Sequence, residues 1–162
     1  MAGNHKMSEY SAYEASIYNQ TTSSAAAIAL DQSLFTGAKI LLVEDDSTVT
    51  SMLKEWLQNE QYQIHIERDG AGALQKLYSE PYDMILVNRQ LADVSGIDVC
   101  KRFRAFGGET PMIVTSDTDC IEDKEQCFEA GVNDYMTKPY NLRELSARIR
   151  AKIRRAKAFG NK

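Results

Sequence analysis

The chain has 162 residues and a formal net charge of −4, with 43% hydrophobic and 26% charged residues. Its length suffices for one ordinary domain with an appendage, and its composition is typical of a globular protein. The negative charge argues against a nucleic-acid-binding chain, because neutralising phosphates requires a basic surface.

The sequence gives no sign of a membrane or secreted protein. No apolar run approaches the roughly 20 residues that a membrane-spanning helix needs. The first ten residues are polar and lack the apolar segment of a secretory signal. The three cysteines, Cys100, Cys120 and Cys127, show no metal-ligand spacing such as C-x-x-C, and free thiols are typical of a reducing cytosol. We therefore expect a cytoplasmic protein.

Residues 1–37 differ in composition from the rest of the chain. They are rich in Ser, Thr, Ala and Tyr and poor in large aliphatic residues. Ser24 is a candidate cap for a short helix over residues 25–34, which would dock on the domain or on a second copy of it. A flexible leader is the favoured interpretation, since chain ends are poorly ordered unless they are tied down.

Residues 38–159 alternate between strand and helix patterns and are expected to form one domain, with residues 160–162 as a tail. Short apolar or alternating runs predict strands at residues 40–43, 63–67, 84–87, 112–114 and 134–137. Helices follow each strand: one capped by Ser47 with Met52 on its apolar face, one over 70–77, one whose apolar face includes Phe106, one over 122–130 and one capped by Asn141. Five such units predict an open parallel sheet with helices on both faces.

Polar side chains stand where four of these strands end. Glu44 and Asp45 follow the first strand, Asn88 the third, Ser116 the fourth and Lys138 the fifth. In parallel sheets the functional groups gather at the carboxyl ends of the strands. Adjacent acids suit Mg²⁺ beside a phosphoryl group, a lysine can pair with a phosphoryl oxygen or with a carboxylate, and an aspartate between them would be a nucleophile. The pattern predicts a phosphoryl site at this edge.

Several segments from Lys39 to Phe159 resemble the receiver domains of two-component response regulators. The resemblance rests on the first strand with its acid pair, the third strand, the fourth strand with its terminal hydroxyl, and the fifth strand with a Lys-Pro pair: Ile40–Asp46, Asp83–Asn88, Pro111–Ser116 and Ala130–Pro139. It implies the flavodoxin-like, doubly wound fold of chemotaxis receivers, with five parallel strands in the order 2-1-3-4-5.

The resemblance also implies a role for each residue at the edge. Glu44, Asp45 and the backbone carbonyl of Gln90 would hold Mg²⁺. Ser116 and Lys138 would bind the phosphoryl group. The helix that includes Glu144–Arg150 resembles the usual last helix of the family's domain.

Two further residues acquire a role from the same resemblance. Tyr135 would be the switch aromatic coupled to the hydroxyl at the end of the fourth strand, and the peptide bond before Pro139 would be cis. Asn88 would stand at the phosphoacceptor position, where the family has an aspartate. An amide has no nucleophilic oxygen and no charge, so phosphorylation would be lost and Mg²⁺ binding weakened. Ala92 replaces the usual loop proline, and Asp117, in place of an alanine, would add negative charge at the mouth of the site.

Asn88 has two explanations that stay open at this point. It is an engineered or recent Asp→Asn change in a normal receiver, or it marks a natural pseudo-receiver that acts as a phosphorylation-independent interaction module. The explanation by an engineered or recent change is favoured, because the acids Glu44 and Asp45, the hydroxyl of Ser116 and the amine of Lys138 are all retained. A phosphohydrolase on a similar sheet would need the aspartate nucleophile, so we do not expect an enzyme.

The resemblance implies a histidine kinase or a phosphotransfer protein as partner. Phosphorylation would shift a two-state equilibrium and remodel the face built from the fourth helix, fifth strand and fifth helix, which is also a candidate homodimer surface. We expect no direct contact with nucleic acid or membrane. The basic residues over 148–162 are typical of a solvated helix that leads into a linker, so the chain is a candidate fragment of a larger regulator.

Overall fold

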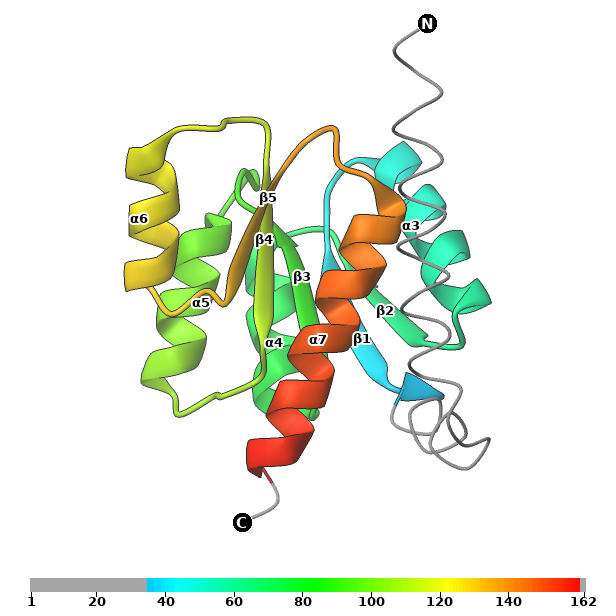
Figure 1. The fold of residues 1–162 in the computed structure, drawn as a ribbon. Helices are drawn as coiled ribbons and strands as arrows, with labels where there is room; N and C mark the ends of the chain where they lie inside the picture. The colour runs from blue at the N-terminus through cyan, green and yellow to red at the C-terminus, as the bar shows by residue number, and fades with distance from the viewer. Residues whose placement is uncertain (1–34, 161–162) are drawn as a thin grey trace, which may run out of the picture. The chain divides into compact units, whose positions relative to one another are not determined.

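Five short parallel strands form the centre of the fold in the computed structural model, which describes residues 35–160 (Figure 1). The strands are β1 (Lys39–Val43), β2 (Gln63–Glu67), β3 (Met84–Asn88), β4 (Met112–Ser116) and β5 (Asp134–Thr137). Their order is β2-β1-β3-β4-β5, and every neighbouring pair is parallel. The flavodoxin-like topology predicted from the sequence is therefore confirmed.

Helices cover both faces of this sheet. They are α3 (Ser47–Asn59), α4 (Gly70–Ser79), α5 (Gly96–Ala105), α6 (Ile121–Glu129) and α7 (Leu142–Gly160). In Figure 1, α7 crosses in front of the sheet and α4 lies behind it. Helices α3 and α7 share one face, where the Trp56 indole N–H donates to Ser146 Oγ at 2.8 Å. Residues of α4, α5 and α6 pack together on the other face.

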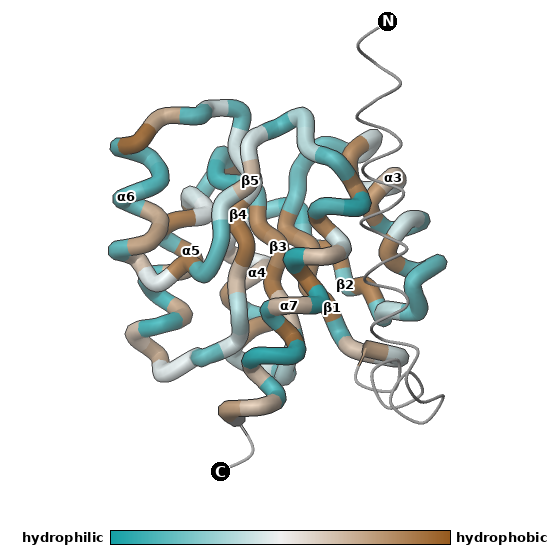
Figure 2. The backbone as a smooth tube through the Cα atoms, in the orientation of Figure 1, coloured by the Kyte–Doolittle hydropathy of each residue, from teal (hydrophilic) through white to brown (hydrophobic). Residues whose placement is uncertain are grey.

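The strands alternate their side chains between these two layers. The central strands β3 and β4 are largely hydrophobic in Figure 2, and all of their residues are buried. On β3, Ile85 and Val87 belong to the core cluster shared with α4, α5 and α6. The alternation places Met84 and Leu86 toward the other layer, and all four side chains are at most 1% exposed. Burying one such side chain contributes roughly 1.5–3 kcal/mol, which makes the sheet a rigid platform for the loops at its carboxyl edge.

The start of α3 differs from the sequence prediction. Asp46, and not Ser47, is the cap residue: its carboxylate accepts hydrogen bonds from the backbone N–H of Thr48 at 2.8 Å and of Val49 at 3.2 Å. A carboxylate can satisfy two of the unpaired N–H groups of a first turn. The predicted apolar position Met52 is 45% exposed, because the buried side of α3 is centred on Leu53 and Leu57.

The end of α5 also differs from the prediction. Phe106 lies one residue beyond the helix, where the helical period no longer directs its side chain, and it is 64% exposed. It packs instead against the ring of Tyr78, with centroids 4.5 Å apart. Other predicted ends are confirmed: Gly131 has a left-handed φ of 100° after α6, and Asn141 Oδ1 accepts the N–H of Arg143 at 2.8 Å at the start of α7.

The predicted helix over residues 25–34 lies outside the described residues. The compact unit that the structure describes begins at Phe35, which is 7% exposed. The predicted boundaries of the leader and of the tail stay predictions. Over residues 35–160, no helix is both long and apolar enough to cross a membrane.

Candidate functional site

The carboxyl edge of the sheet brings together the residues predicted for the site. Asn88 ends β3 and is paired in register with Thr115, and Ser116 at the end of β4 is paired with Thr137. Glu44 directly follows β1, and Lys138 directly follows β5. The roles assigned to these residues stay predictions, but their common location follows from the parallel register.

Glu44 and Lys138 are in direct contact although 94 residues separate them. The Lys138 Nζ lies 3.4 Å from Glu44 Oε1 and 3.5 Å from Oε2. The Glu44 side chain is only 3% exposed and that of Lys138 18%. Burial raises the pKa of the Glu44 carboxyl above its ordinary value, and the Lys138 ammonium opposes this rise. The lysine thus compensates the charge of a carboxylate that is almost fully buried.

Asp45 and Gln90 lie on the open side of the edge, and both are exposed. The Gln90 backbone N–H donates to the Asn88 side-chain oxygen at 3.3 Å. Asp117, directly after β4, and Ala92, in the loop after β3, are exposed as well. The carboxylate of Asp117 therefore adds negative charge at the solvent side of the edge.

Asn88 itself is 7% exposed and is enclosed by the loop that follows β3. A Cβ on Gly96 would lie 2.5 Å from the Asn88 carbonyl oxygen, so a glycine is needed for this close approach. The Asp93 carboxylate accepts the N–H groups of Gly70 at 2.8 Å and Ala71 at 3.0 Å, which joins the loop to the start of α4. These and other backbone hydrogen bonds lower the pKa of Asp93 to about 2. The sequence analysis missed Asp93.

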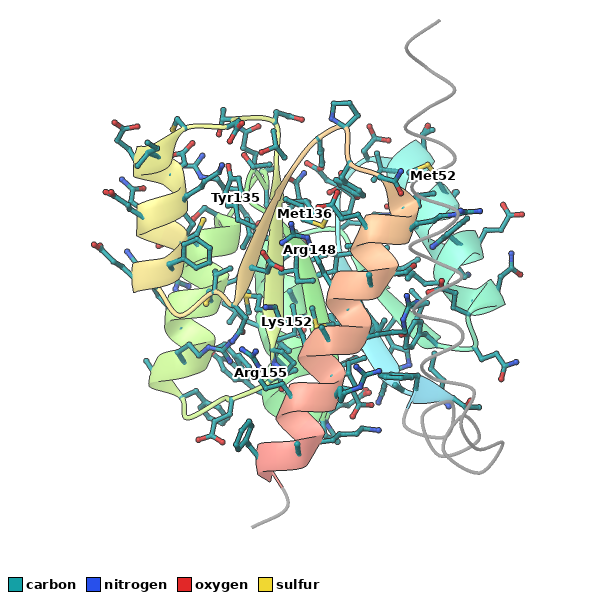
Figure 3. All side chains as sticks on the ribbon, in the orientation of Figure 1. Met52, Tyr135, Met136, Arg148, Lys152 and Arg155 are labelled. Carbon is teal, nitrogen blue, oxygen red and sulfur yellow. The ribbon has the colours of Figure 1, made fainter. Side chains whose placement is uncertain are left out.

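Ser116 and Tyr135 are coupled through a residue that the sequence analysis also missed, Thr118. Ser116 is fully buried, and its Oγ accepts the Thr118 backbone N–H at 3.1 Å. Tyr135 is 8% exposed, and its hydroxyl donates to the Thr118 carbonyl at 2.5 Å. Figure 3 shows the Tyr135 ring beside β5. The aromatic ring is thus held inward by the loop between β4 and α6.

A second missed pair lies beside this loop. Arg89 Nη2 is 2.7 Å from Asp123 Oδ1, and the two side chains are 22% and 16% exposed. The other carboxylate oxygen of Asp123 accepts the Thr118 hydroxyl at 2.6 Å. The Thr118 hydrogen bond is the main cause that lowers the pKa of Asp123. No spacing pattern in the sequence predicts this pair. Arg89 lies in a loop and Asp123 in a helix, and only the folded arrangement of these two segments brings them together.

The model of the response regulator receiver domain family matches residues 40–150 of the chain. The chain is a response regulator receiver domain. Among the described residues, the sheet order agrees with this membership.

Relatives that match this receiver in sequence include longer proteins. It is 37% identical over 117 residues to the response regulator ArlR of Staphylococcus saprophyticus, an alignment that covers 72% of the chain and 53% of that protein. The chain spans about half the length of the first curated relatives it matches. Among solved structures, the Francisella response regulator 1452 receiver domain has a TM-score of 0.72 at 28% identity, with 74% of this chain and 99% of that one covered.

A second solved structure bears on the metal. The receiver domain of a sensor histidine kinase from Pseudomonas aeruginosa has a TM-score of 0.67 at 30% identity, with 73% of this chain and 98% of that one covered, and it holds a magnesium ion in its active site cleft. In the receiver described above, Glu44, Asp45 and the backbone carbonyl of Gln90 offer the hard oxygen donors that Mg²⁺ prefers. Within residues 35–160, however, no three His, Cys, Asp or Glu side chains form a metal-binding group. The donors fit Mg²⁺ in kind, with one carboxylate fewer than an aspartate at position 88 would provide.

Proposed function

We propose that this receiver belongs to a two-component pathway and cannot accept a phosphoryl group, because Asn88 occupies the phosphoacceptor position. The observation that carries this proposal is the location of Asn88 at the end of β3, beside the Glu44–Lys138 pair. An aspartate there would be the nucleophile, whereas an amide oxygen cannot form the acyl phosphate. The histidine kinase or phosphotransfer protein that would donate the group is the inferred partner, and no turnover of a substrate is expected.

The retained residues support an engineered or recent Asp→Asn change. Glu44, Asp45, Ser116 and Lys138 are all present at the edge. A lineage that had long been free of phosphorylation would be expected to lose some of them. A natural pseudo-receiver is the alternative, and an asparagine codon at this position in the native gene and in its near relatives would establish it.

Mg²⁺ would be held in this receiver by Glu44, Asp45 and the backbone carbonyl of Gln90. When bound, the ion would supply positive charge to phosphoryl oxygens at this edge. Asn88 brings no negative charge to this group, so we infer that binding is weaker than in a receiver with an aspartate. Because position 88 carries no negative charge, Lys138 can pair with Glu44 instead. The distance of 3.4 Å between Lys138 Nζ and Glu44 Oε1 supports this inference.

Incubation of the chain with acetyl phosphate and Mg²⁺ tests this proposal. We expect the intact mass to remain unchanged, because no nucleophilic oxygen stands at position 88. A stable phosphoryl group mapped to Asn88 by peptide mass spectrometry would contradict the proposal. An output domain in the full-length regulator is a further part of the same proposal and is supported by the greater length of the relatives. A cytoplasmic location is another part, and the free thiols of Cys100, Cys120 and Cys127 support it.

We also infer a homodimer through the face built from α6, β5 and α7. The exposed side of α6 is acidic and carries two exposed apolar residues, Ile121 at 69% and Phe128 at 50%. The side of α7 toward β5 is basic, with Arg148, Lys152 and Arg155 (Figure 3). In a two-fold dimer each acidic helix meets the basic helix of the second copy.

Sedimentation equilibrium tests the dimer. Phe128→Glu should weaken association at least about tenfold, because it places a charge in the apolar part of the interface. Phe106→Glu is the matched control, since Phe106 directly follows α5, is 64% exposed and lies outside this face. A chain that stays monomeric at every concentration, or an equal effect of the two substitutions, would overturn the inferred dimer.

A further inference from the structure

A continuous chain of polar contacts joins β3 to β5 around the loop that follows β4. It runs from Arg89 to Asp123, from Asp123 to the Thr118 hydroxyl, and from the Thr118 carbonyl to the Tyr135 hydroxyl. We refer to these four residues as the latch. The latch uses both carboxylate oxygens of Asp123 and both the side chain and the backbone of Thr118. The loop that contains Thr118 is therefore held by Asp123 through the hydroxyl and by Tyr135 through the carbonyl.

The cation end of the latch is well anchored. The Arg89 backbone N–H donates to the Thr115 carbonyl at 2.8 Å, so the residue is fixed to β4. Its Nε is buried without a hydrogen-bond partner. A buried N–H without a partner is unfavourable. The guanidinium nevertheless stays at this position, and the contact that compensates is its ion pair with Asp123.

The aromatic end of the latch, Tyr135, has a further contact with α6. The Lys124 ammonium lies over the Tyr135 ring, 5.8 Å from its centroid, and Lys124 also pairs with Asp119 of the same loop. Ser116, whose hydroxyl would contact a phosphoryl group, already has partners: its Oγ lies 3.1 Å from Thr118 Oγ1 and accepts the Thr118 N–H. Ser116 and Tyr135, the two residues of the predicted switch, are therefore both engaged by the chain itself.

We propose that Arg89 and Asp123 are positioning residues that hold Tyr135 inward without any phosphoryl group, so the face of α6, β5 and α7 keeps one arrangement whatever the input. The inference rests on the proposed function, in which Asn88 has removed the phosphorylation step. It goes further because it assigns the control of the switch to a pair outside the phosphoryl site. In physical terms, the ion pair replaces phosphate as the contact that biases a two-state loop.

Hydroxyl-radical footprinting of the full chain, read by mass spectrometry at Tyr135, tests the latch. Arg89→Met and Asp123→Asn should each raise the oxidation rate of Tyr135 about fivefold or more, since one hydrogen bond to a charged group changes an equilibrium constant about tenfold. The double variant should give no further increase, because the two residues act through one contact. Thr118→Val should have the same effect, as it removes the hydroxyl and retains the carbonyl.

The control is Glu80→Gln, which breaks an ion pair of similar exposure with Lys39, at 2.6 Å, near the amino ends of the strands. It should leave Tyr135 oxidation unchanged. Asp123→Asn is an almost isosteric variant, and circular dichroism checks that it folds. The latch would be overturned if Tyr135 were oxidised at the same rate in the original chain, in the control and in Asp123→Asn. The experiment uses neither kinase nor phosphodonor, so its failure is distinguishable from phosphorylation at position 88, which would overturn the proposed function alone.

Discussion

Replacing Asn88 by aspartate should restore phosphorylation to this receiver. With acetyl phosphate and Mg²⁺, the variant should gain the mass of one phosphoryl group at position 88, whereas the original chain should gain none. The carboxylate supplies the nucleophilic oxygen that the amide lacks, and Ser116 and Lys138 already stand at the adjoining strand ends. Intact-mass and peptide mass spectrometry measure the outcome.

The same substitution should tighten Mg²⁺ binding at least about tenfold. It adds one negative charge to the edge that already holds Glu44 and Asp45. The Coulomb attraction between a unit charge and a divalent cation a few ångström away corresponds to more than a tenfold change in affinity, even at a high effective dielectric constant. Isothermal titration calorimetry gives the ratio directly. Asn59→Asp is the matched control, because it makes the same chemical change at an exposed position at the end of α3.

Asn59→Asp should alter neither phosphorylation nor Mg²⁺ affinity. A folded Asn88→Asp variant that binds Mg²⁺ but takes no phosphoryl group would contradict the assignment of position 88. A phosphoryl group that appears on another residue would contradict it as well. Either outcome would leave the fold and the family untouched, since those rest on the sheet order and on the match over residues 40–150.

The sheet could be predicted from the sequence because its strands are short apolar runs that only a doubly covered parallel sheet can bury. The helices were less predictable in detail. Met52 and Phe106 satisfy a helical period, yet both are exposed. Periodicity tells which residues share a side of a helix, but neither how wide the buried stripe is nor where the helix ends. The sequence also does not decide between Asp46 and Ser47 as the cap of α3, because both side chains can accept hydrogen bonds from the N–H groups of the first turn.

The meeting of Glu44, Asn88, Ser116 and Lys138 was predictable, because parallel strands deliver their carboxyl ends to one edge. The contacts beyond that edge were not. Arg89 and Asp123 are 34 residues apart, and their pairing depends on how the loop between β4 and α6 is folded. A charged residue in a loop and an acid in the first turn of a helix are each too common to indicate a contact.

Lys138→Met should destabilise the receiver at neutral pH, and the loss should fade as the pH falls. The variant leaves the Glu44 carboxylate, 3% exposed, without the cation that compensates it. We expect the free energy of unfolding to fall by about 2 kcal/mol at pH 7, below the range for a fully buried pair because Lys138 is partly exposed. Urea unfolding without Mg²⁺, repeated between pH 7 and pH 4, measures this loss.

The pH dependence has a definite sign. Burial raises the folded-state pKa of Glu44 above its ordinary value of 4.5, and removal of Lys138 raises it further. A group with a raised pKa takes up its proton first in the folded state, so the penalty is full above that pKa and disappears as the pH falls through it toward 4.5. A loss of stability that stays constant from pH 7 to pH 4 would contradict the role of Glu44.

Two further variants separate charge from packing. Adding Glu44→Gln to Lys138→Met removes the uncompensated charge at nearly constant volume, so the double variant should recover most of the stability at pH 7. Lys152→Met is the matched lysine control. Lys152 is 22% exposed and lies 3.8 Å from Asp134, whose carboxylate also pairs with Arg148. Because that carboxylate keeps a cation, the control should cost less than about 1 kcal/mol, and the difference from Lys138→Met measures the effect of leaving a buried carboxylate alone.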